Sequence, residues 1–136
     1  MVTAIDSSVL LDVLLDDASY AESSKAALHQ AHAEGSLIIC ETVLAEICPV
    51  LGPKEVSPFL SDWNLNFAPS TRDSAILAGQ MFQLYLERGG KRSRVVADFL
   101  IGAHAQMHSA RLLARDRGFY RDYFKKLDLW DPSETR

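Results

Sequence analysis

Short apolar runs alternate with segments of helical periodicity along the whole chain, and this alternation constrains the fold more than any other feature. Strands are predicted at residues 2–5, 36–40, 65–68, 111–114 and 127–130. Helices are predicted over 9–14, 19–34, from 42 to just before Pro49, 54–62, 71–87 and 96–109, with a short helix or turn at 117–125. Strands that alternate with helices are typical of a parallel sheet covered on both faces. The sequence therefore predicts an α/β protein, a three-layer α/β/α sandwich with a parallel sheet.

Two local signals help to set the helix ends. Gly35 follows the helical segment 19–34 and is a stop signal. Ser70 and Asp73 have the spacing of a capping box at the start of the helix over 71–87.

The composition indicates a single globular domain over residues 1–136. Apolar residues make up 48% of the chain and charged residues 24%, a balance typical of a soluble globule. No stretch approaches the roughly 18 consecutive apolar residues of a membrane span, and no basic leader precedes the first strand. We therefore expect a cytoplasmic protein with no membrane association. Its two cysteines, Cys40 and Cys48, are expected to be reduced thiols.

Charge is divided unevenly along the chain. Residues 1–70 carry ten acids against two lysines, a net charge of −8, whereas residues 71–136 carry eight acids against twelve Lys or Arg, a net charge of +4. This asymmetry suggests a strongly charged partner near the C-terminal half, although such runs are also common on solvated surfaces.

Four acidic residues fall where sites form in parallel sheets, beyond the carboxyl ends of the strands. Asp6 ends the first strand, Glu46 lies in the second turn of the helix after the second strand, Asp98 lies in the first turn of its helix, and Asp116 follows the fourth strand. Each acid alone has an ordinary explanation as a helix cap or an exposed charge. Together they predict an acidic site at one edge of the sheet.

The helix that carries Glu46 is expected to face the sheet with Val43, Ile47 and Val50, which places Glu46 beside the buried stripe. The helix of Asp98 has a comparable pattern. Its expected stripe consists of Ala97, Leu100, Ile101 and Ala105.

A cluster of carboxylates needs a counter-charge. Two carboxylates about 5 Å apart repel by about 3 kcal/mol at an effective dielectric constant near 20. Protons or cations must offset this repulsion, and oxygen ligands of this kind suit Mg²⁺ or Mn²⁺. Such ions assist phosphodiester hydrolysis by activating water and by stabilising charge on the phosphate.

Four segments of the sequence resemble the ordered motifs of PIN-domain ribonucleases. They are IDSSVLL (5–11), TVLAE (42–46), DFLIGAHA (98–105) and LLARDRGF (112–119). The chain length and the ending around 123–132 are similar to the VapC-type toxins of toxin-antitoxin pairs. The resemblance implies a PIN-like, Rossmann-like sandwich, Mg²⁺- or Mn²⁺-dependent cleavage of structured RNA, a homodimer and a cognate antitoxin protein. It makes Asp6, Glu46, Asp98 and Asp116 the acidic quartet, with Asp6 and Asp98 as direct metal ligands.

Two positions depart from the family pattern. Many members have Thr at the position of Ala114 and a second Asp at the position of Gly118, so a supporting hydroxyl and a fifth carboxylate are missing. One alternative is therefore a catalytically silent PIN-like module that binds RNA or a protein. Another is a phosphoacceptor receiver domain, although Asp131 and Pro132 occupy the place where that family has a Lys.

Basic residues surround the expected acidic site. Arg92 and Arg94 belong to the loop before Asp98, and chain length alone keeps Arg94 within about 14 Å of that residue. Arg115 and Arg117 flank Asp116. These four arginines are candidates for binding RNA phosphates. The alternatives are a solvated loop for the first pair, and ion pairs with the quartet or with antitoxin acids for the second.

Several other side chains have both a functional and a structural interpretation. Ser7 and Ser8 either support the carboxylate of Asp6 and its bound ion or simply cap the following helix. His104 and His108 lack a third zinc ligand and are expected to be core or surface imidazoles. Four aromatic residues could stack on bases, but packing is favoured: Phe119, Tyr120, Tyr123 and Phe124.

Overall fold

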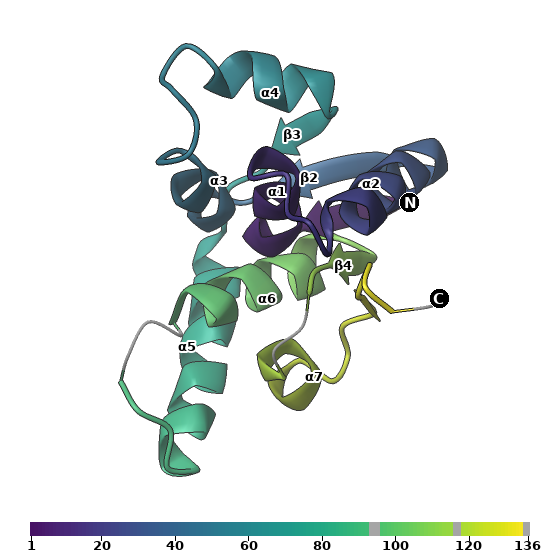
Figure 1. Cartoon of the computed structure of the whole chain (residues 1–136). Coiled ribbons are helices and arrows are strands. Elements are labelled where there is room, and N and C mark those ends of the chain that lie inside the picture. The colour runs from purple at the N-terminus through teal and green to yellow at the C-terminus, as the bar shows by residue number, and fades with distance from the viewer. Residues whose placement is uncertain (93–95, 116–117, 135–136) are drawn as a thin grey trace.

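The computed structural model describes residues 1–92, 96–115 and 118–134, and within them a five-stranded parallel sheet forms the centre of the protein (Figure 1). The strands lie in the order β3-β2-β1-β4-β5. They are β1 (Val2–Ile5), β2 (Ser36–Ile39), β3 (Leu65–Phe67), β4 (Arg111–Leu113) and β5 (Leu129–Trp130). Every neighbouring pair is parallel, so the predicted α/β architecture is confirmed.

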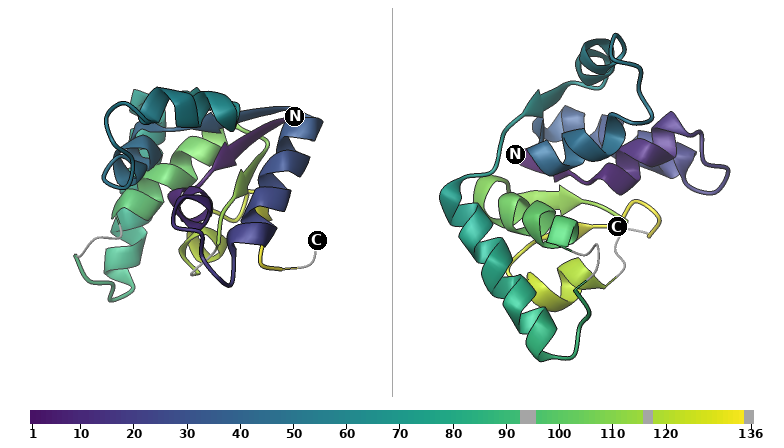
Figure 2. Two further views of the ribbon diagram at one scale, coloured as in Figure 1. Left: turned by 45° about the horizontal axis from the view of Figure 1, so that its top comes forward. Right: turned by 90° about the vertical axis from the view of Figure 1, so that its left-hand side faces the viewer.

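Seven helices in the described residues connect and cover these strands. They are α1 (Ser7–Leu14), α2 (Ala21–Glu34), α3 (Glu41–Ile47), α4 (Val56–Asp62), α5 (Arg72–Glu87), α6 (Val96–His108) and α7 (Phe119–Tyr123). Helices α1 to α4 lie on one side of the sheet and α5 to α7 on the other (Figure 2). This is the arrangement that right-handed crossovers produce when the chain first moves outward from β1 to β3 and then returns to β4 and β5.

The central strands are buried because helices cover both of their faces, and their buried polar side chains are paired, since Arg111 Nε of β4 donates to the Thr3 hydroxyl of β1 at 2.9 Å. In β1, Ala4 lies opposite Ile38 of β2 and Leu112 of β4. Ile5 and Leu112 are almost completely buried. Burial of a side chain of this size contributes about 2 kcal/mol, so these strands hold the sheet together from its centre.

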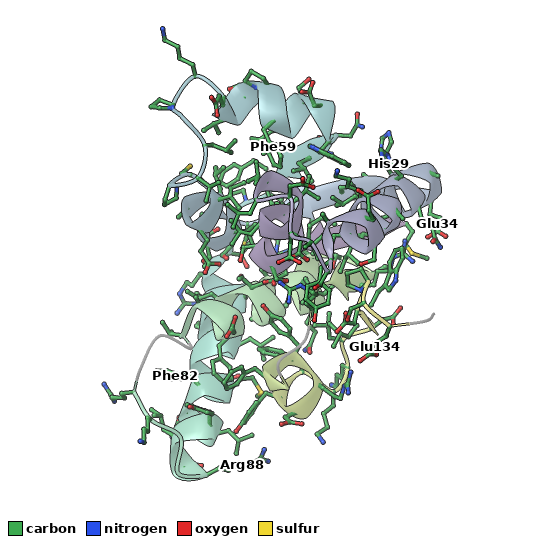
Figure 3. All side chains as sticks on the ribbon, viewed as in Figure 1. His29, Glu34, Phe59, Phe82, Arg88 and Glu134 are labelled. Atoms are coloured by element: carbon green, nitrogen blue, oxygen red, sulfur yellow. The ribbon has the colours of Figure 1, made fainter. Side chains whose placement is uncertain are left out.

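Aromatic rings fill the layer formed by α5, α6 and α7. Phe99 is fully buried, and its ring centroid lies 5.3 Å from that of Tyr123, 5.6 Å from that of Tyr85 and 6.1 Å from that of Phe119. Phe82 extends this cluster on the α5 side (Figure 3). The preference for packing over base stacking is therefore confirmed for these rings.

The start of α5 differs from the prediction. Thr71, rather than Ser70, is the N-cap, and its hydroxyl accepts a hydrogen bond from the backbone N–H of Ser74 at 3.1 Å. The Ser74 hydroxyl in turn accepts from the N–H of Thr71 at 3.0 Å, which completes a capping box. The predicted pair Ser70 and Asp73 is wrong because the N–H of Ser70 instead donates to Glu41.

The stop signal at Gly35 is confirmed, and close contact between two chain segments explains it. A Cβ atom at Gly35 would lie 1.7 Å from the carbonyl oxygen of Met1. That same oxygen accepts a hydrogen bond from the N–H of Ser36 at 3.0 Å. Only glycine lets α2 end against the beginning of β1.

The order of the strands creates a switch point between β1 and β4. From β1 the chain proceeds to β2 and β3 on one side, and it returns to β4 and β5 on the other. The segments that leave the carboxyl ends of β1 and β4 diverge there and leave room for a site. Within the described residues, no helix combines the length and apolarity that a membrane span requires.

Candidate active site

A cavity of about 170 Å³ lies at this switch point. Its lining combines three carboxylates with hydroxyl, guanidinium and aromatic groups. The lining residues are Asp6, Ser7, Ser8, Leu11, Glu46, Asp98, Arg115, Phe119 and Tyr120. Three of the four predicted acids, carried by the segments after β1, after β2 and before β4, therefore meet in one place.

Asp6 follows β1 directly and is the N-cap of α1. Its backbone is extended, and its Oδ2 accepts hydrogen bonds from the N–H of Ser8 at 3.1 Å and from the Ser8 hydroxyl at 2.5 Å. Its Oδ1 accepts a hydrogen bond from the Tyr120 hydroxyl at 2.8 Å. The residue is only 5% exposed, so this carboxylate is held firmly inside the cavity.

Glu46 lies in the second turn of α3 and bonds to the segment after β1. Its Oε1 accepts a hydrogen bond from the Ser7 hydroxyl at 2.9 Å. Partial desolvation and the negative charge of Asp6 raise the pKa of Glu46, while the bond from Ser7 opposes this shift. The stripe predicted for this helix is correct at Val43 and Ile47, but it is wrong at Val50, which lies beyond the end of α3 and is 40% exposed.

Asp98 lies in the first turn of α6 and is half-buried at the cavity. Its Oδ1 lies 3.5 Å from the hydroxyl oxygen of Tyr120. The predicted stripe of this helix is confirmed at Ile101 and Ala105, but it omits Phe99, which is fully buried in the aromatic cluster.

Ser7 and Ser8 both hold acidic side chains at the cavity. The Ser7 hydroxyl donates to Glu46, and the Ser8 hydroxyl donates to Asp6. The Ser8 Oγ also accepts a hydrogen bond from the N–H of Arg115 at 3.1 Å. The alternative in which either serine is the helix cap is wrong, because Asp6 occupies that position.

Arg115 lines the cavity, and its guanidinium is bound to Asp12 of α1. Its Nε and Nη2 donate to the two oxygens of that carboxylate at 2.8 and 2.7 Å. Its guanidinium carbon also lies 4.2 Å above the ring of Tyr20. The partner of Arg115 is therefore an acid outside the predicted quartet.

Of the other predicted RNA contacts, only Arg92 lies among the described residues. Arg92 is exposed in the loop that follows Arg88 at the far end of α5 (Figure 3), and it is not among the residues that line the cavity. Arg94, Asp116 and Arg117 lie outside the described residues.

His104 is a core residue, as expected. It is almost completely buried, and its Nε2 lies 2.6 Å from the carbonyl oxygen of Ala68. Burial lowers the pKa of His104, so the neutral imidazole is favoured. His108 lies beside it and contacts the Thr71 hydroxyl at 3.3 Å.

Tyr120 is the site residue that sequence reasoning missed. The residue is 4% exposed, and its hydroxyl reaches both Asp6 and Asp98. Burial, followed by the negative charges of Asp6, Asp98 and Glu46, raises the pKa of Tyr120 well above its usual value. Its place directly after the segment LLARDRGF (112–119) is the signal that could have pointed to the site.

The described part of the chain does not contain a ready-made ligand cluster. In residues 1–92, 96–115 and 118–134, no three His, Cys, Asp or Glu side chains are grouped closely enough to hold a metal ion. Asp6, Glu46 and Asp98 share a cavity, where Ser8 and Tyr120 donate to Asp6, Ser7 donates to Glu46, and the Tyr120 hydroxyl lies 3.5 Å from Asp98.

The fold and the site define an α/β sandwich with three carboxylates at its topological switch point, and comparison with known proteins identifies the family. The family model described as PIN domain matches residues 3–125. The chain belongs to the PIN domain family. The receiver-domain alternative is therefore wrong.

Solved structures share this fold at low sequence identity. A chain of VapBC2 from Rickettsia felis, bound to a promoter DNA fragment, superposes with a TM-score of 0.72 at 20% identity, covering 96% of this chain and 100% of that one. For VapBC-1 from nontypeable Haemophilus influenzae the TM-score is 0.72 at 12% identity, covering 98% and 100%. For the sarcin-ricin loop cleaving toxin VapC20 from Mycobacterium tuberculosis the TM-score is 0.57 at 16% identity, covering 88% and 93%. A comparison with curated proteins gave no match.

Proposed function

We propose that this protein is the endoribonuclease toxin of a type II toxin-antitoxin system and cleaves structured RNA with the help of Mg²⁺ or Mn²⁺. The observation that carries the proposal is the meeting of Asp6, Glu46 and Asp98 at one cavity of a PIN domain. Asp116 is proposed as the fourth acid. The similarity of fold to VapC20, a sarcin-ricin loop cleaving toxin, supports the choice of substrate class.

The donor set fits a hard divalent ion. All three described acids offer carboxylate oxygens, the ligands that Mg²⁺ and Mn²⁺ prefer. In the described residues Asp6 and Glu46 form hydrogen bonds with hydroxyl and amide groups, and neither forms an ion pair. Their negative charge is therefore still present to attract a cation.

Asp6 and Asp98 are the proposed direct ligands, with Glu46 and Asp116 completing the acidic site. A bound ion would supply a water of lowered pKa and positive charge beside the scissile phosphate. The protein supplies fixed carboxylates for this chemistry. Ser8 orients Asp6 through two hydrogen bonds, and Ser7 orients Glu46.

An acidic cavity repels RNA, so basic groups must offset its charge at the neighbouring phosphates. We propose Arg92, Arg94 and Arg117 for this role. Arg115 remains a candidate RNA contact only through Nη1 of its guanidinium, because Nε and Nη2 already donate to Asp12.

The remaining parts of the proposal concern organisation and partners. The chain is proposed to be a single domain over residues 1–136, a cytoplasmic homodimer, and the target of a cognate antitoxin. Three of the structural neighbours are VapBC structures, and this supports an antitoxin as a partner. Light scattering of the purified protein tests the dimer, and co-expression with a protein encoded beside it tests the antitoxin.

Cleavage of a structured RNA by the purified protein tests the activity. A hairpin RNA and an unpaired RNA of the same composition are incubated with Mg²⁺, with Mn²⁺ or with EDTA. The expected result is cleavage of the hairpin that requires metal. Asp98→Asn should lower the rate by about two orders of magnitude or more, because a lost ion removes several kcal/mol of transition-state stabilisation.

The matched control is Asp62→Asn, which removes an exposed acid at the end of α4. This variant should cleave at the parent rate. Equal cleavage by the parent and Asp98→Asn would refute the nuclease proposal and would point to a contaminating ribonuclease.

A second candidate is the catalytically silent module that binds RNA or a protein. The absence of a ready-made ligand cluster in the described residues favours it, as do Ala114 and Gly118. This candidate predicts that the hairpin RNA binds equally well in EDTA and in Mg²⁺ and remains intact.

A further inference from the structure

The hydroxyl of Tyr120 lies next to two carboxylates, Asp6 and Asp98, that are far apart in the sequence. Its oxygen is 2.8 Å from Asp6 Oδ1 and 3.5 Å from Asp98 Oδ1. Asp6 follows β1 and Asp98 lies in the first turn of α6, so backbone hydrogen bonds of one regular element do not hold the two acids in register. The Tyr120 hydroxyl has one hydrogen, which it donates to Asp6 while its oxygen lies next to Asp98.

The ring of Tyr120 is held in place independently of the hydroxyl. Tyr120 belongs to the buried core, and the neighbouring Phe119 and Tyr123 pack edge-on against Phe99 of α6. Because α7 is anchored against α6 in this way, the position of the hydroxyl is set by core packing. A rigid aromatic anchor can therefore fix the location of a polar group inside an acidic cavity.

Most acceptor sites of the Asp6 carboxylate are already used by hydrogen bonds from described residues. An ionised carboxylate has about four acceptor sites, two on each oxygen. Ser8 occupies both sites of Oδ2 through its N–H and its hydroxyl, and Tyr120 occupies one site of Oδ1. One acceptor site is left, on the same oxygen that faces Tyr120. An ion held by Asp6 must therefore share this oxygen with the Tyr120 hydroxyl.

We propose that Tyr120 is a positioning residue whose hydroxyl holds Asp6 beside Asp98 in the orientation that binds a divalent cation. This inference rests on the proposed metal-dependent function. Without the hydroxyl, Asp6 loses a hydrogen-bond donor at the oxygen nearest Tyr120, and the repulsion between the two carboxylates in a shielded cavity is no longer opposed there. Loss of a hydrogen-bonding partner behind a metal ligand typically weakens metal affinity by about 10- to 100-fold.

Binding of Mn²⁺ to the full chain tests the role of Tyr120 without any need for RNA cleavage. Tyr120→Phe removes the hydroxyl and keeps the ring in the core. The control Tyr123→Phe removes a hydroxyl from the same helix, and that hydroxyl is not at the cavity. Free Mn²⁺ is measured by electron paramagnetic resonance, and thermal unfolding confirms that each variant is folded.

We expect Tyr120→Phe to bind Mn²⁺ about 10-fold or more weakly than the parent, whereas Tyr123→Phe binds like the parent. Cleavage by Tyr120→Phe should recover most of the parent rate at saturating Mn²⁺, because the hydroxyl positions the ligands and does not touch the reacting atoms. A general packing defect would instead lower the rate at every Mn²⁺ concentration.

Mn²⁺ binding by the parent, Asp98→Asn and Tyr120→Phe distinguishes a failure of the Tyr120 role from a failure of the proposed metal site. If the parent binds Mn²⁺, Asp98→Asn does not, and Tyr120→Phe binds as tightly as the parent, only the role of Tyr120 is overturned. If the parent does not bind Mn²⁺, or Asp98→Asn binds it equally well, the metal site itself is wrong and the role of Tyr120 falls with it.

Discussion

Arg115 and Asp12 form a two-point ion pair in which Nε and Nη2 donate to the two carboxylate oxygens at 2.8 and 2.7 Å. Asp12 is only 3% exposed and also accepts a hydrogen bond from the Ser24 hydroxyl at 2.8 Å. The pair joins α1 and α2 to the segment after β4. It therefore fixes the backbone immediately before Asp116, in addition to any contact that Arg115 makes with RNA.

Removal of Arg115 should destabilise the protein strongly. Arg115→Ala leaves the Asp12 carboxylate buried without its charged partner, and such a loss typically costs about 3–5 kcal/mol. The side chain of Arg115 is 29% exposed, so the lower end of that range is expected. Chemical unfolding measures the free energy. Arg121→Ala is the control, because its 3.7 Å pair with Glu134 is largely exposed and should contribute less than about 1 kcal/mol. Similar losses for the two variants would contradict the structural role of Arg115.

The corrected capping box at α5 gives a second prediction. Thr71→Ala removes the hydroxyl that accepts from Ser74, and it should lower stability by about 1 kcal/mol. Ser70→Ala should be neutral or slightly stabilising, because the Ser70 hydroxyl is buried and no hydrogen-bond partner is described for it. Thermal unfolding of both variants checks the assignment, and a larger loss for Ser70→Ala would restore the original prediction.

Acid should destabilise the protein through His104. Burial is the largest cause of the lowered pKa of this imidazole, so the folded state binds its proton less readily than the unfolded state does. The stability is fully present above the unfolded pKa of about 6.5 and is lost as the pH falls from there through the lowered pKa of the folded state. The variant His104→Gln keeps an amide donor for the Ala68 carbonyl and does not titrate. Its unfolding free energy should fall less steeply between pH 7.5 and 5.5, and an unchanged slope would assign the acid sensitivity to other groups.

Glu46 should show the opposite dependence on pH. Desolvation is the largest cause of its raised pKa, and the charge of Asp6 adds to it. The contribution of Glu46 to stability is fully present below its unfolded pKa of about 4.3 and is lost as the pH rises through the raised pKa of the folded state. Glu46→Gln retains an oxygen that can accept from Ser7, so the metal-free variant should be slightly more stable than the parent at pH 7. Thermal unfolding in EDTA measures this difference, and a less stable variant would show that the ionised carboxylate stabilises the fold.

Periodicity and spacing correctly predicted the α/β architecture. The apolar strands and the gaps between them required a parallel sheet, and the carboxyl ends of such strands lie on one edge. That rule predicts a common edge for Asp6 and Glu46, and Asp98 joins them at the cavity because it lies in the first turn of α6, the helix that leads into β4. The predicted N-cap of α5 was wrong because Ser70 and Thr71 are adjacent and either hydroxyl could cap the helix. Two hydroxyl residues in sequence offer the same cap, and only the tertiary bond from Ser70 to Glu41 separates them.

The α/β class with its parallel sheet and the acidic edge were predictable from the sequence itself, because both depend on local periodicity and on chain connectivity, whereas the strand order came from the structure. The tertiary structure alone decided which polar groups meet at that edge. Tyr120 reaches Asp6 across 114 residues, and Arg115 reaches Asp12 across 103. Local pattern does not encode these pairs, because they depend on how α7 and the segment after β4 pack against elements formed elsewhere in the chain. A buried tyrosine therefore had the pattern of a core residue in the sequence, and its hydroxyl became part of the site only when the helices packed.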